Sequence, residues 1–562
     1  MSRLSLRVAL AAGLPALAAA CTPAAPAASP GPAASPGPAG SPAAAASRRP
    51  CAILSVNDTY RIEPLADGAG GLAHLRAVRA RLQKEHQDLV TLHAGDFLSP
   101  SLLGRKYRGA HMIDVLNRLD GSEAFDPRLI VTFGNHEFDH DDPSVLSSRM
   151  SEAAFRLLSS NIEFARTADG TPKVGTHKIA QDVILGCGDY KLGIFAVTTD
   201  VKRQPYVAGF ADPIETARAE TRSLRERGAQ VVVGLTHLDM ATDRRLLETL
   251  GAGGPDLVVG GHEHVKQRSA PGGRAAYKAD ADARTANFLQ VSGEPGSLVV
   301  THEWIDLPAG GPSDPDLDAV VKKWMEEHER SYCKDKMSAP PGCLSEQLTV
   351  AQTRLLAEEL TIRRYESNLG DFVADEMLSA SSKEGAQIAF INAGTLRLNY
   401  NIEKGAPVTR RVVEELFAYR APLRVIRISG ATLSSILSRA VSGWTGQGHF
   451  LQIAGFAFRH DGRGNVRDIT LLGPKPRRIK PDETLLAVTT TFLLDPKGDQ
   501  DGYTMISPDD IVGPPELRSK LDDGPDLKEL VVKAFRAAGK AGIAPAVQGR
   551  ICDPEASLCL AL

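Results

Sequence analysis

The first half of the chain alternates short apolar runs with longer stretches of helical apolar spacing. Five runs rich in β-branched residues predict strands buried on both faces: Ala52–Val56, Leu89–Leu92, Leu129–Phe133, Val231–Leu235 and Leu257–Gly260. Between them, Gly71–His86 and Asp212–Gly228 have the periodicity of amphipathic helices. Strand–helix alternation of this kind predicts an α/β domain in which helices cover a sheet.

The second half predicts another α/β domain. A charged helix over about Leu317–Ser331 leads into a proline-containing segment flanked by Cys333 and Cys343, where we place the domain boundary. Helices follow near Asn368–Ser382 and Thr432–Val441. Strands are predicted near Ile388–Ile391, Arg424–Ile428 and Glu483–Thr491. The predicted order is a first domain at 51–312, a linker helix and loop at 313–344, and a second domain at 345–552.

The first 50 residues contain no pattern of a folded domain. Arg3 and Arg7 precede an apolar stretch that ends in Ala18-Ala19-Ala20, which predicts a secretory signal over residues 1–20. Leu17 to Cys21 resembles a lipoprotein signal, although Leu17 lies one place further from the cysteine than usual. We therefore expect an exported lipoprotein of the cell envelope, anchored through a lipidated Cys21; ordinary secretion is the alternative. Residues 21–50 are Ala, Pro, Gly and Ser almost throughout and predict a tether.

Composition excludes several classes of partner. The 562 residues carry a net charge of −3 without a basic stripe, which argues against binding to a nucleic-acid duplex. Aromatic residues make up only 5%, so a stacking surface for single strands is not expected either. After the leader, no stretch is apolar for long enough to span a bilayer. Nothing in the sequence indicates an oligomeric state.

Six of the seven cysteines remain when Cys21 is set aside, and an even number in an exported chain suggests disulfides, with 15 possible pairings. Cys333–Cys343 and Cys552–Cys559 would each close a short polar loop. Cys51–Cys187 is then the remaining pair. A zinc site built from cysteines is not expected, because the chain has no Cys-x-x-Cys motif.

Five short polar motifs directly follow the predicted strands of the first domain. They are Asn57-Asp58-Thr59-Tyr60, Gly95-Asp96, Gly134-Asn135-His136-Glu137, Thr236-His237 and Gly261-His262-Glu263-His264. Open α/β sheets bind ligands at the carboxyl ends of their strands, so these motifs are expected to share one crevice. Their carboxylate, amide and imidazole groups are the donors that hard metal ions require.

A bridged pair of metal ions requires a shared ligand. Asp96 is the natural bridge, since a carboxylate offers two oxygens, and Asn135 adds an oxygen without charge. His262 and His264 are two residues apart, so in an extended segment both would point to one face. Each motif alone has an ordinary explanation; a single Gly-Asp, for instance, is usually a turn. Taken in order, the five predict a dinuclear site, and two adjacent metal ions can hydrolyse a phosphate ester.

The series resembles that of the calcineurin-like metallophosphoesterases, and residues 51–551 as a whole resemble the secreted bacterial 5′-nucleotidases. The resemblance implies a metallophosphoesterase β-sandwich flanked by helices, followed by an α/β (α+β) substrate-binding domain. It places Asp58, Asp96 and His264 on one divalent ion (Zn, Mn, Fe or Co) and Asp96, Asn135, His237 and His262 on the other. It also implies a catalytic dyad of His136 and Asp139. Residues three apart at a helix start do meet on one face, and the carboxylate would favour an imidazolium that donates to the phosphoryl group. First-turn helix charge is the alternative role for Asp139.

The second domain resembles the nucleotide-binding half of the same family. Asn392-Ala393-Gly394-Thr395-Leu396-Arg397 resembles a loop whose arginine binds substrate. Gly448-His449-Phe450 and Asp501-Gly502-Tyr503 resemble two segments whose aromatic rings stack on a base. The resemblance thus implies Arg397, Phe450 and Tyr503 as substrate-binding residues. A surface ion pair for Arg397 and core packing for the two rings are the alternatives.

Tyr60 departs from the family, which has Asp-x-His where this chain has Asp58-Thr59-Tyr60. A phenol with a pKa of about 10 ligates only a strong Lewis acid. The other possibilities are one donor fewer, a water in its place, or compensation by His93. The expected function is a metal-dependent 5′-nucleotidase. The alternatives are hydrolysis of UDP-sugars or 2′,3′-cyclic nucleotides on the same site, and a nucleotide-binding lipoprotein with a degenerate metal site.

Overall fold

The computed structural model describes residues 48–175, 177–200, 204–334, 342–444, 446–498, 500–556 and 558–560. The predicted secretory signal, Cys21 and residues 21–47 of the tether lie outside these residues. Arg48 and Arg49, at the end of the predicted tether, already contact the first domain. Arg48 pairs with Glu294 at 2.9 Å and Arg49 with Asp189 at 3.0 Å, so the folded unit begins slightly before residue 51.

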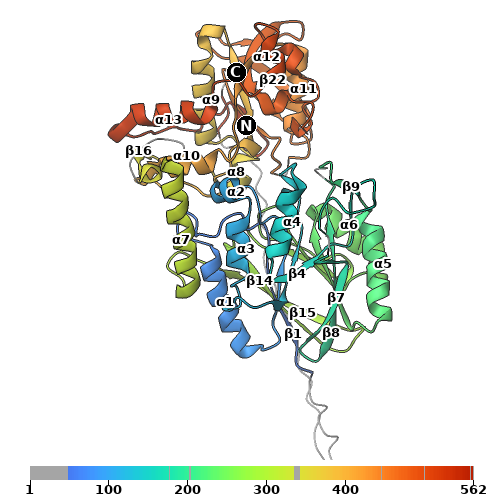
Figure 1. Ribbon diagram of the computed structural model, residues 1–562. Helices are drawn as coiled ribbons and strands as arrows, with labels where there is room; N and C mark the ends of the chain where they lie inside the picture. Colours follow the sequence, from blue (N-terminus) through green and yellow to red (C-terminus); the bar gives the residue numbers. More distant parts are fainter. Residues whose placement is uncertain are drawn as a thin grey trace, which may run out of the picture. The chain divides into compact units, whose positions relative to one another are not determined.

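The first domain is built on two sheets (Figure 1). The larger has seven strands in the order β15 (Val299–Asp306), β14 (Thr285–Ser292), β1 (Cys51–Val56), β2 (Val90–His93), β3 (Asp126–Thr132), β4 (Phe155–Leu158) and β6 (Ile179–Ala180). The smaller has six, in the order β12 (Gln267–Ser269), β13 (Ala275–Lys278), β11 (Leu257–Gly260), β10 (Val231–His237), β8 (Tyr190–Thr198) and β7 (Asp182–Cys187). A two-stranded ribbon pairs β5 (Ile162–Phe164) with β9 (Val207–Phe210).

Three hydrophobic layers hold this domain together. Side chains such as Ile53 and Val233 fill the space between the two sheets. The outer face of the larger sheet packs against α1 (Leu72–Glu85), α2 (Leu102–Tyr107), α3 (Ala110–Leu116), α4 (Pro143–Glu152) and α7 (Pro315–Tyr332). The outer face of the smaller sheet packs against α5 (Pro213–Glu226) and α6 (Met240–Leu250), and Figure 1 shows α5 beside β7. Each fully buried Leu or Val contributes about 1.5–3 kcal/mol, so these layers fix the strand ends that carry the polar motifs. The predicted β-sandwich flanked by helices is confirmed.

The second domain surrounds a four-stranded sheet in the order β19 (Leu423–Ser429), β24 (Thr484–Thr490), β17 (Ile388–Asn392) and β20 (Leu451–Ala454). One face packs against α9 (Asn368–Ala380), α10 (Arg410–Leu416) and α13 (Leu527–Ala538), and the other against α11 (Gly430–Ala440). Two smaller sheets join β23 (Arg477–Arg478), β22 (Val466–Leu471), β21 (Phe456–His460) and β25 (Ile551–Cys552), and β16 (Gln347–Val350) with β18 (Pro407–Thr409). Short helices α8 (Glu359–Ile362) and α12 (Glu516–Ser519) complete the domain.

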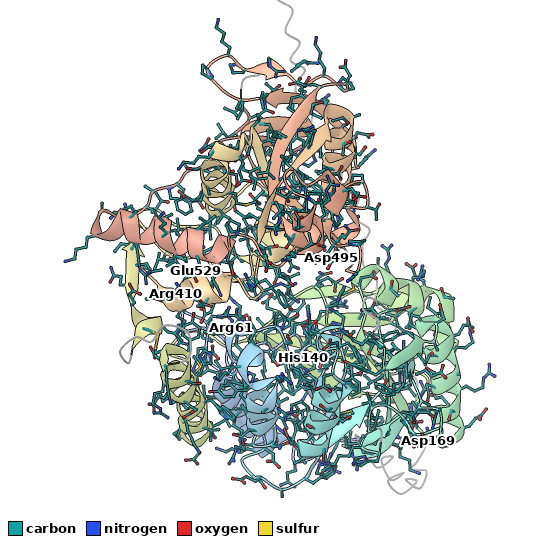
Figure 2. The ribbon with its side chains drawn as sticks, turned by 45° about the horizontal axis from the view of Figure 1, so that its top comes forward. Arg61, His140, Asp169, Arg410, Asp495 and Glu529 are labelled. Atoms are coloured by element: carbon teal, nitrogen blue, oxygen red, sulfur yellow. A yellow bond between two sulfur atoms is a disulfide. The ribbon has the colours of Figure 1, made fainter. Side chains whose placement is uncertain are left out.

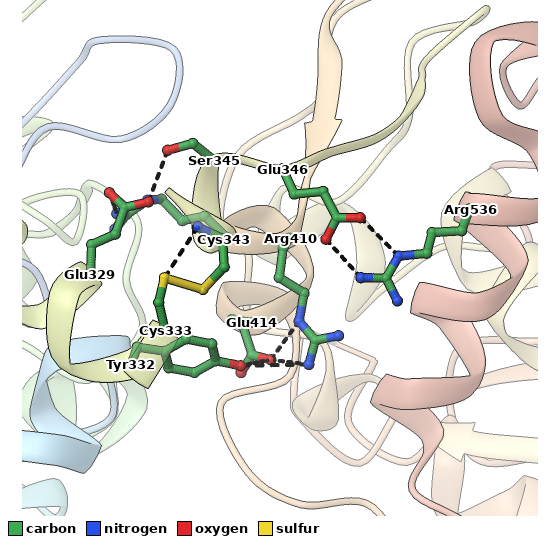
Figure 3. The surroundings of a disulfide bond; sticks show 10 residues. Glu329, Tyr332, Cys333, Cys343, Ser345, Glu346, Arg410, Glu414 and Arg536 are labelled. Atoms are coloured by element: carbon green, nitrogen blue, oxygen red, sulfur yellow. Dashed lines mark hydrogen bonds and ion pairs between the residues drawn. A yellow bond between two sulfur atoms is a disulfide. The ribbon is translucent and has the colours of Figure 1, made fainter. Parts of the chain in front are cut away.

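The linker helix α7 is fastened to the second domain at its carboxyl end (Figure 3). Tyr332 donates from its hydroxyl to Glu414 at 2.6 Å, beside the disulfide between Cys333 and Cys343. Glu414 lies on α10, and its carboxylate also accepts a hydrogen bond from the Arg410 guanidinium at 2.8 Å. From the first domain, Arg105 of α2 donates to the Glu414 carbonyl at 3.0 Å. Helix α10 of the second domain is therefore contacted by both the linker helix and the first domain.

The periodicity predictions agree with these elements. β11 has the predicted bounds, and the two predicted helices of the first domain become α1 and α5, shorter by one or two residues at each end. β10 runs two residues further than predicted and ends at His237 itself. All three predicted disulfides are present, including Cys51–Cys187, which joins the start of β1 to the end of β7. In the described part of the chain, no helix has the length and apolar character to cross a membrane.

Candidate metal and phosphoester site

Strand register brings the five polar motifs to one edge of the first domain. β1, β2 and β3 are parallel neighbours, so the loops carrying Asp58, Asp96 and Asn135 follow one another along the sheet edge. In the second sheet, Thr236 near the end of β10 pairs with Gly260 at the end of β11. His237 and the His262–His264 loop therefore leave that sheet together. The two sheet edges meet at one buried cluster of donors.

Glycine is required where these loops cross. A Cβ atom on Gly134 would lie 2.1 Å from Asp96 Oδ1 and 2.6 Å from His237 Cε1. A Cβ atom on Gly261 would lie 2.8 Å from Asp58 Oδ2 and 2.7 Å from the Ala94 carbonyl. Any side chain at either position would displace a donor, because real Cβ atoms do not approach other atoms this closely. The two glycines thus set the spacing of the site.

One group of donors, which we call the His237 side, comprises Asp96, Asn135, His237 and His262. His237 Nε2 lies 3.2 Å from Asp96 Oδ2 and 3.2 Å from Asn135 Oδ1. His262 Nδ1 lies 3.2 Å from the same Asn135 oxygen. The second ring nitrogen of His237 hydrogen-bonds to the Ala94 carbonyl at 2.7 Å, so its orientation is fixed within the first domain.

The other group, the His264 side, comprises Asp58, Tyr60 and His264. His264 Nε2 lies 3.4 Å from Asp58 Oδ1 and 2.6 Å from the Tyr60 hydroxyl. The Tyr60 hydroxyl lies 3.0 Å from Asp96 Oδ2, the oxygen that also faces His237. A single oxygen of Asp96 thus lies between the two sides. His93 has another partner on this loop: its Nε2 lies 2.6 Å from Thr59 Oγ1.

The backbone around the histidine pair differs from the prediction. His262 has φ 93° and His264 has φ 58°, so this segment is left-handed and not extended. Asp58 and Asp96 share that conformation, with φ of 51° and 57°. The prediction of an extended segment was wrong because a tight turn after β11 aims the two rings at different donors. Asp and His tolerate this region better than most residues do, which suits their concentration here.

The donor set fits divalent metal ions. Asp58, Asp96 and His237 each present one ligand atom within 4.8 Å of the others, and all three are buried. Burial acts to lower the pKa of His264, but Glu359 and Asp58 raise it to about 10. His237 behaves likewise: its pKa rises to about 9 through Asp96 and Asp58 against the effect of burial. Without metal, two imidazolium groups balance the buried carboxylates, and a cation of higher charge can replace those protons.

The predicted dyad is assembled. His136 and Asp139 bound the short 3-10 helix His136–Phe138, and His136 Nδ1 lies 3.0 Å from Asp139 Oδ2. The hydroxyl of Tyr419, from the second domain, donates to the same Asp139 oxygen at 3.0 Å. The backbone N–H of His136 donates to Asp96 Oδ1 at 2.8 Å, which ties the dyad to the donor set.

Glu137 lies inside the Gly134-Asn135-His136-Glu137 motif, but no role was predicted for it. Its buried carboxylate accepts the backbone N–H groups of Asp96, Phe97, Leu98 and Gly134 at 2.6–3.0 Å. Burial and the Asp96 charge raise the pKa of Glu137 to about 7. Glu137 thus clamps two of the donor loops together, and its position within a Gly-Asn-His sequence was the available signal.

Next to the His264 side is a cavity lined by both domains. Tyr60, Arg61 and His264 contribute from the first domain, and Glu359, Arg397 and Glu415 from the second. Arg397 is thus the one predicted substrate-binding residue that lines this cavity. Its Nε donates to the Gly394 carbonyl at 2.9 Å, and its guanidinium carbon lies 5.9 Å from the centre of the Tyr419 ring.

The two predicted base-stacking residues lie elsewhere. Phe450 and Tyr503 are 2% and 0% exposed and belong to a hydrophobic cluster of the second domain. Tyr503 donates its hydroxyl to the His449 carbonyl. This geometry is that of core packing, because both rings are covered on their faces. Stacking on a base stays a prediction that the structure does not test.

The family comparisons agree with this site. Residues 52–266 match the calcineurin-like phosphoesterases, and residues 347–507 match the 5′-nucleotidase C-terminal domain. The chain is a calcineurin-like phosphoesterase with a 5′-nucleotidase C-terminal domain. The 5′-nucleotidase of Homo sapiens is 23% identical over 564 residues, covering 90% of this chain and 91% of the human protein.

Two solved structures have the same fold as this chain. The 5′-nucleotidase precursor from Thermus thermophilus has a TM-score of 0.72 and 23% identity, covering 90% of this chain and all of that one. The sulfate thiohydrolase SoxB of the same organism has a TM-score of 0.66 and 16% identity, covering 91% and 97% of the two chains. At these identities the likeness extends to fold alone. Because one fold carries different activities, the substrate must be argued from the site.

Proposed function

We propose that this protein is an exported 5′-nucleotidase that uses two divalent metal ions to release phosphate from nucleoside monophosphates. The observation that carries the proposal is the convergence of six donors beside a cavity that both domains line. Asp96, Asn135, His237 and His262 would hold one ion, and Asp58, Asp96 and His264 the other. Bound there, the ions would lower the pKa of water and neutralise charge on the phosphoryl group.

The remaining residues orient the substrate and handle protons. Asp139 accepts from His136 Nδ1, which leaves Nε2 as the donor to a phosphoryl oxygen whose charge grows in the transition state. Arg397 contributes a fixed positive charge in the cavity, suited to a phosphate or carboxylate. The backbone N–H of His136 donates to Asp96, and this hydrogen bond fixes the position of the His136 side chain relative to the metal ligands.

The site also limits what Tyr60 does. Burial, Asp96 and Asp58 raise the pKa of Tyr60 well above its ordinary value. In the metal-free protein it is therefore a neutral phenol that donates to the carboxylates. We propose that Tyr60 stands where the family has a histidine ligand but does not itself ligate a divalent ion. The His264 side therefore has one donor fewer.

The proposal is tested by phosphate release from purified protein supplied with Mn²⁺ or Zn²⁺. The panel contains nucleoside 5′-monophosphates, a UDP-sugar and a 2′,3′-cyclic nucleotide. Release should be fastest with a 5′-monophosphate, and Asn135→Ala and His136→Ala should abolish it. Failure to release phosphate from any member of the panel with either metal would refute the enzyme assignment.

Export and anchoring are separate parts of the proposal. Three disulfides suit an oxidising compartment outside the cytoplasm. Cys21, at the end of the predicted signal, is the proposed site of lipidation. Labelled palmitate should be incorporated into the wild-type protein and not into Cys21→Ser; equal labelling of the two would contradict lipidation at this residue.

A further inference from the structure

The His264 side receives a carboxylate from the second domain. Glu359, the first residue of α8, places Oε2 at 2.5 Å from His264 Nδ1. The side chains are 7% and 8% exposed, so water competes little for this contact. The other ring nitrogen of His264 faces Tyr60 and Asp58. Glu359 and the donor cluster thus hold opposite edges of one imidazole ring.

Glu359 is itself held in place. Its second oxygen pairs with Arg363, one turn later on the same domain. The carboxylate is therefore oriented by a partner within the second domain. Such a group accepts the Nδ1 proton and leaves Nε2 free to ligate a metal, which fixes the tautomer as well as the ring direction.

Other contacts hold the second domain against this site. Arg61, next to Tyr60, pairs with Glu415 at 2.8 Å, and both side chains are under 10% exposed. In Figure 2 Arg61 lies where the two domains meet. Tyr419 reaches Asp139 from the same domain. The position of Glu359 relative to His264 is thus determined by the docking of the two domains.

We propose that Glu359 is a positioning residue for His264, so that docking of the second domain completes the His264 side of the metal centre. The inference rests on the proposed function, because it takes His264 as a metal ligand. His237 needs no such help, since its Nδ1 partner, the Ala94 carbonyl, belongs to the first domain. The two ions should therefore differ in their dependence on the second domain. Loss of a carboxylate behind a ligating histidine typically costs 10–100-fold in affinity.

The experiment measures Mn²⁺ binding to metal-free protein by calorimetry, with electron paramagnetic resonance to detect the coupled pair. The ion on the His264 side has one donor fewer, so we call it the weaker ion; the ion on the His237 side is the tighter one. In Glu359→Ala, the dissociation constant of the weaker ion should rise by about 10–100-fold and the coupled signal should fade, while the tighter ion is retained. Glu359→Asp should recover part of the loss. Circular dichroism confirms that each variant is folded.

Glu403→Ala is the matched control, because Glu403 is a carboxylate of the second domain that pairs with Arg354 at 2.9 Å on the surface and takes no part in the contacts between the domains named above. It should leave the ion on the His264 side within about twofold of wild type, a shift of about 0.4 kcal/mol. The proposal is overturned if Glu359→Ala binds both ions like wild type, or if Glu403→Ala weakens the same ion equally. Wild-type protein that binds no Mn²⁺ would instead refute the proposed function, before any variant is compared.

Discussion

The two sides of the donor cluster differ in how many parts of the chain they need. On the His237 side, every ligand comes from the first domain, and so does the hydrogen bond from Ala94 that orients His237. On the His264 side, a tyrosine stands among the donors and the orienting carboxylate comes from residue 359, 95 positions further along the chain. One side is a property of a single domain; the other depends on two. We therefore expect the two metal ions to respond differently to mutation.

Asp96→Asn should remove the difference altogether, because Asp96 Oδ2 faces both sides. We expect a fall in kcat of at least about three orders of magnitude, equivalent to about 4 kcal/mol, together with loss of both ions. Phosphate release and elemental analysis of the purified variant measure these effects.

Asp169→Asn provides the control for that substitution. Asp169 lies in an exposed turn, at the edge of the first domain in Figure 2, and hydrogen-bonds only to nearby threonines among the contacts described. It should keep wild-type activity and metal content. An Asp96→Asn enzyme that retained one tightly bound ion would show that the two sides do not share this oxygen.

Tyr60→His should make the His264 side more like the His237 side. An imidazole adds a neutral donor at the place where the phenol now lies 2.6 Å from His264 Nε2. We expect the affinity of the weaker ion to rise about 10-fold, equivalent to about 1.4 kcal/mol. Calorimetric titration with Mn²⁺ measures it.

Tyr60→Phe distinguishes ligation from hydrogen bonding. If the phenol is only a hydrogen-bond donor, its loss should leave metal affinity within about threefold and reduce the stability of the metal-free protein by about 1–3 kcal/mol, since buried carboxylates lose a partner. Loss of an entire ion from Tyr60→Phe would mean that Tyr60 ligates it.

Tyr419→Phe tests the second contact that crosses between the domains. The hydroxyl donates to Asp139, yet the residue is 43% exposed, so water can replace it. We expect kcat to fall by about threefold, or about 0.7 kcal/mol, with metal affinity unchanged. A parallel loss of metal would contradict the separation of the dyad from the metal ligands.

A last prediction concerns pH, away from both sides. His111 of α3 and His328 of α7 are buried; burial and His328 lower the pKa of His111 to about 3, and burial and Arg411 lower that of His328 to about 4. Both folded values lie below the unfolded value of about 6.5. Stability is therefore complete above pH 6.5 and is lost as the pH falls toward 4, because the unfolded chain binds protons first.

Each of the two histidines should lower the free energy of unfolding at pH 5.5 by ~1.4 kcal/mol. In urea titrations, the free energy of unfolding of wild type falls between pH 8 and pH 5.5, and the fall due to this pair of histidines should be about half as large in His111→Gln. His177 lies in an exposed turn, so His177→Gln is the control and should keep the pH dependence of wild type. Identical pH dependence in wild type and His111→Gln would contradict the assignment.

Local pattern was sufficient for most of the fold and for the His237 side. Short β-branched runs such as Leu257–Gly260 fold as predicted because buried parallel strands leave little choice of residue. Donors placed directly after such strands must meet, so Asp96, Asn135 and His237 could be placed together from order alone. The disulfide pairings could also be predicted, because two of them join cysteines that are close in the sequence.

Contacts between the domains could not be predicted in this way. Nothing local to Glu359 or Tyr419 indicates that they face His264 and Asp139, because such contacts depend on how two folded surfaces dock. Backbone conformation was the second gap: the turn at His262 follows from packing against Asp58, which accepts the His262 N–H at 2.9 Å. Resemblance suggested that Phe450 and Tyr503 stack on a base; both side chains belong to a hydrophobic cluster, and stacking on a base stays a prediction.

The left-handed backbone at four of the donors limits how this centre can change over evolutionary time. At Asp58, Asp96, His262 and His264 the φ angle is positive, a conformation that admits few residue types besides Gly, Asn, Asp and His. Tyr60 is not among the residues with positive φ, so a bulky aromatic residue fits there without strain. On the His264 side, substitution is thus easiest at position 60, where the backbone places no such limit on the residue type.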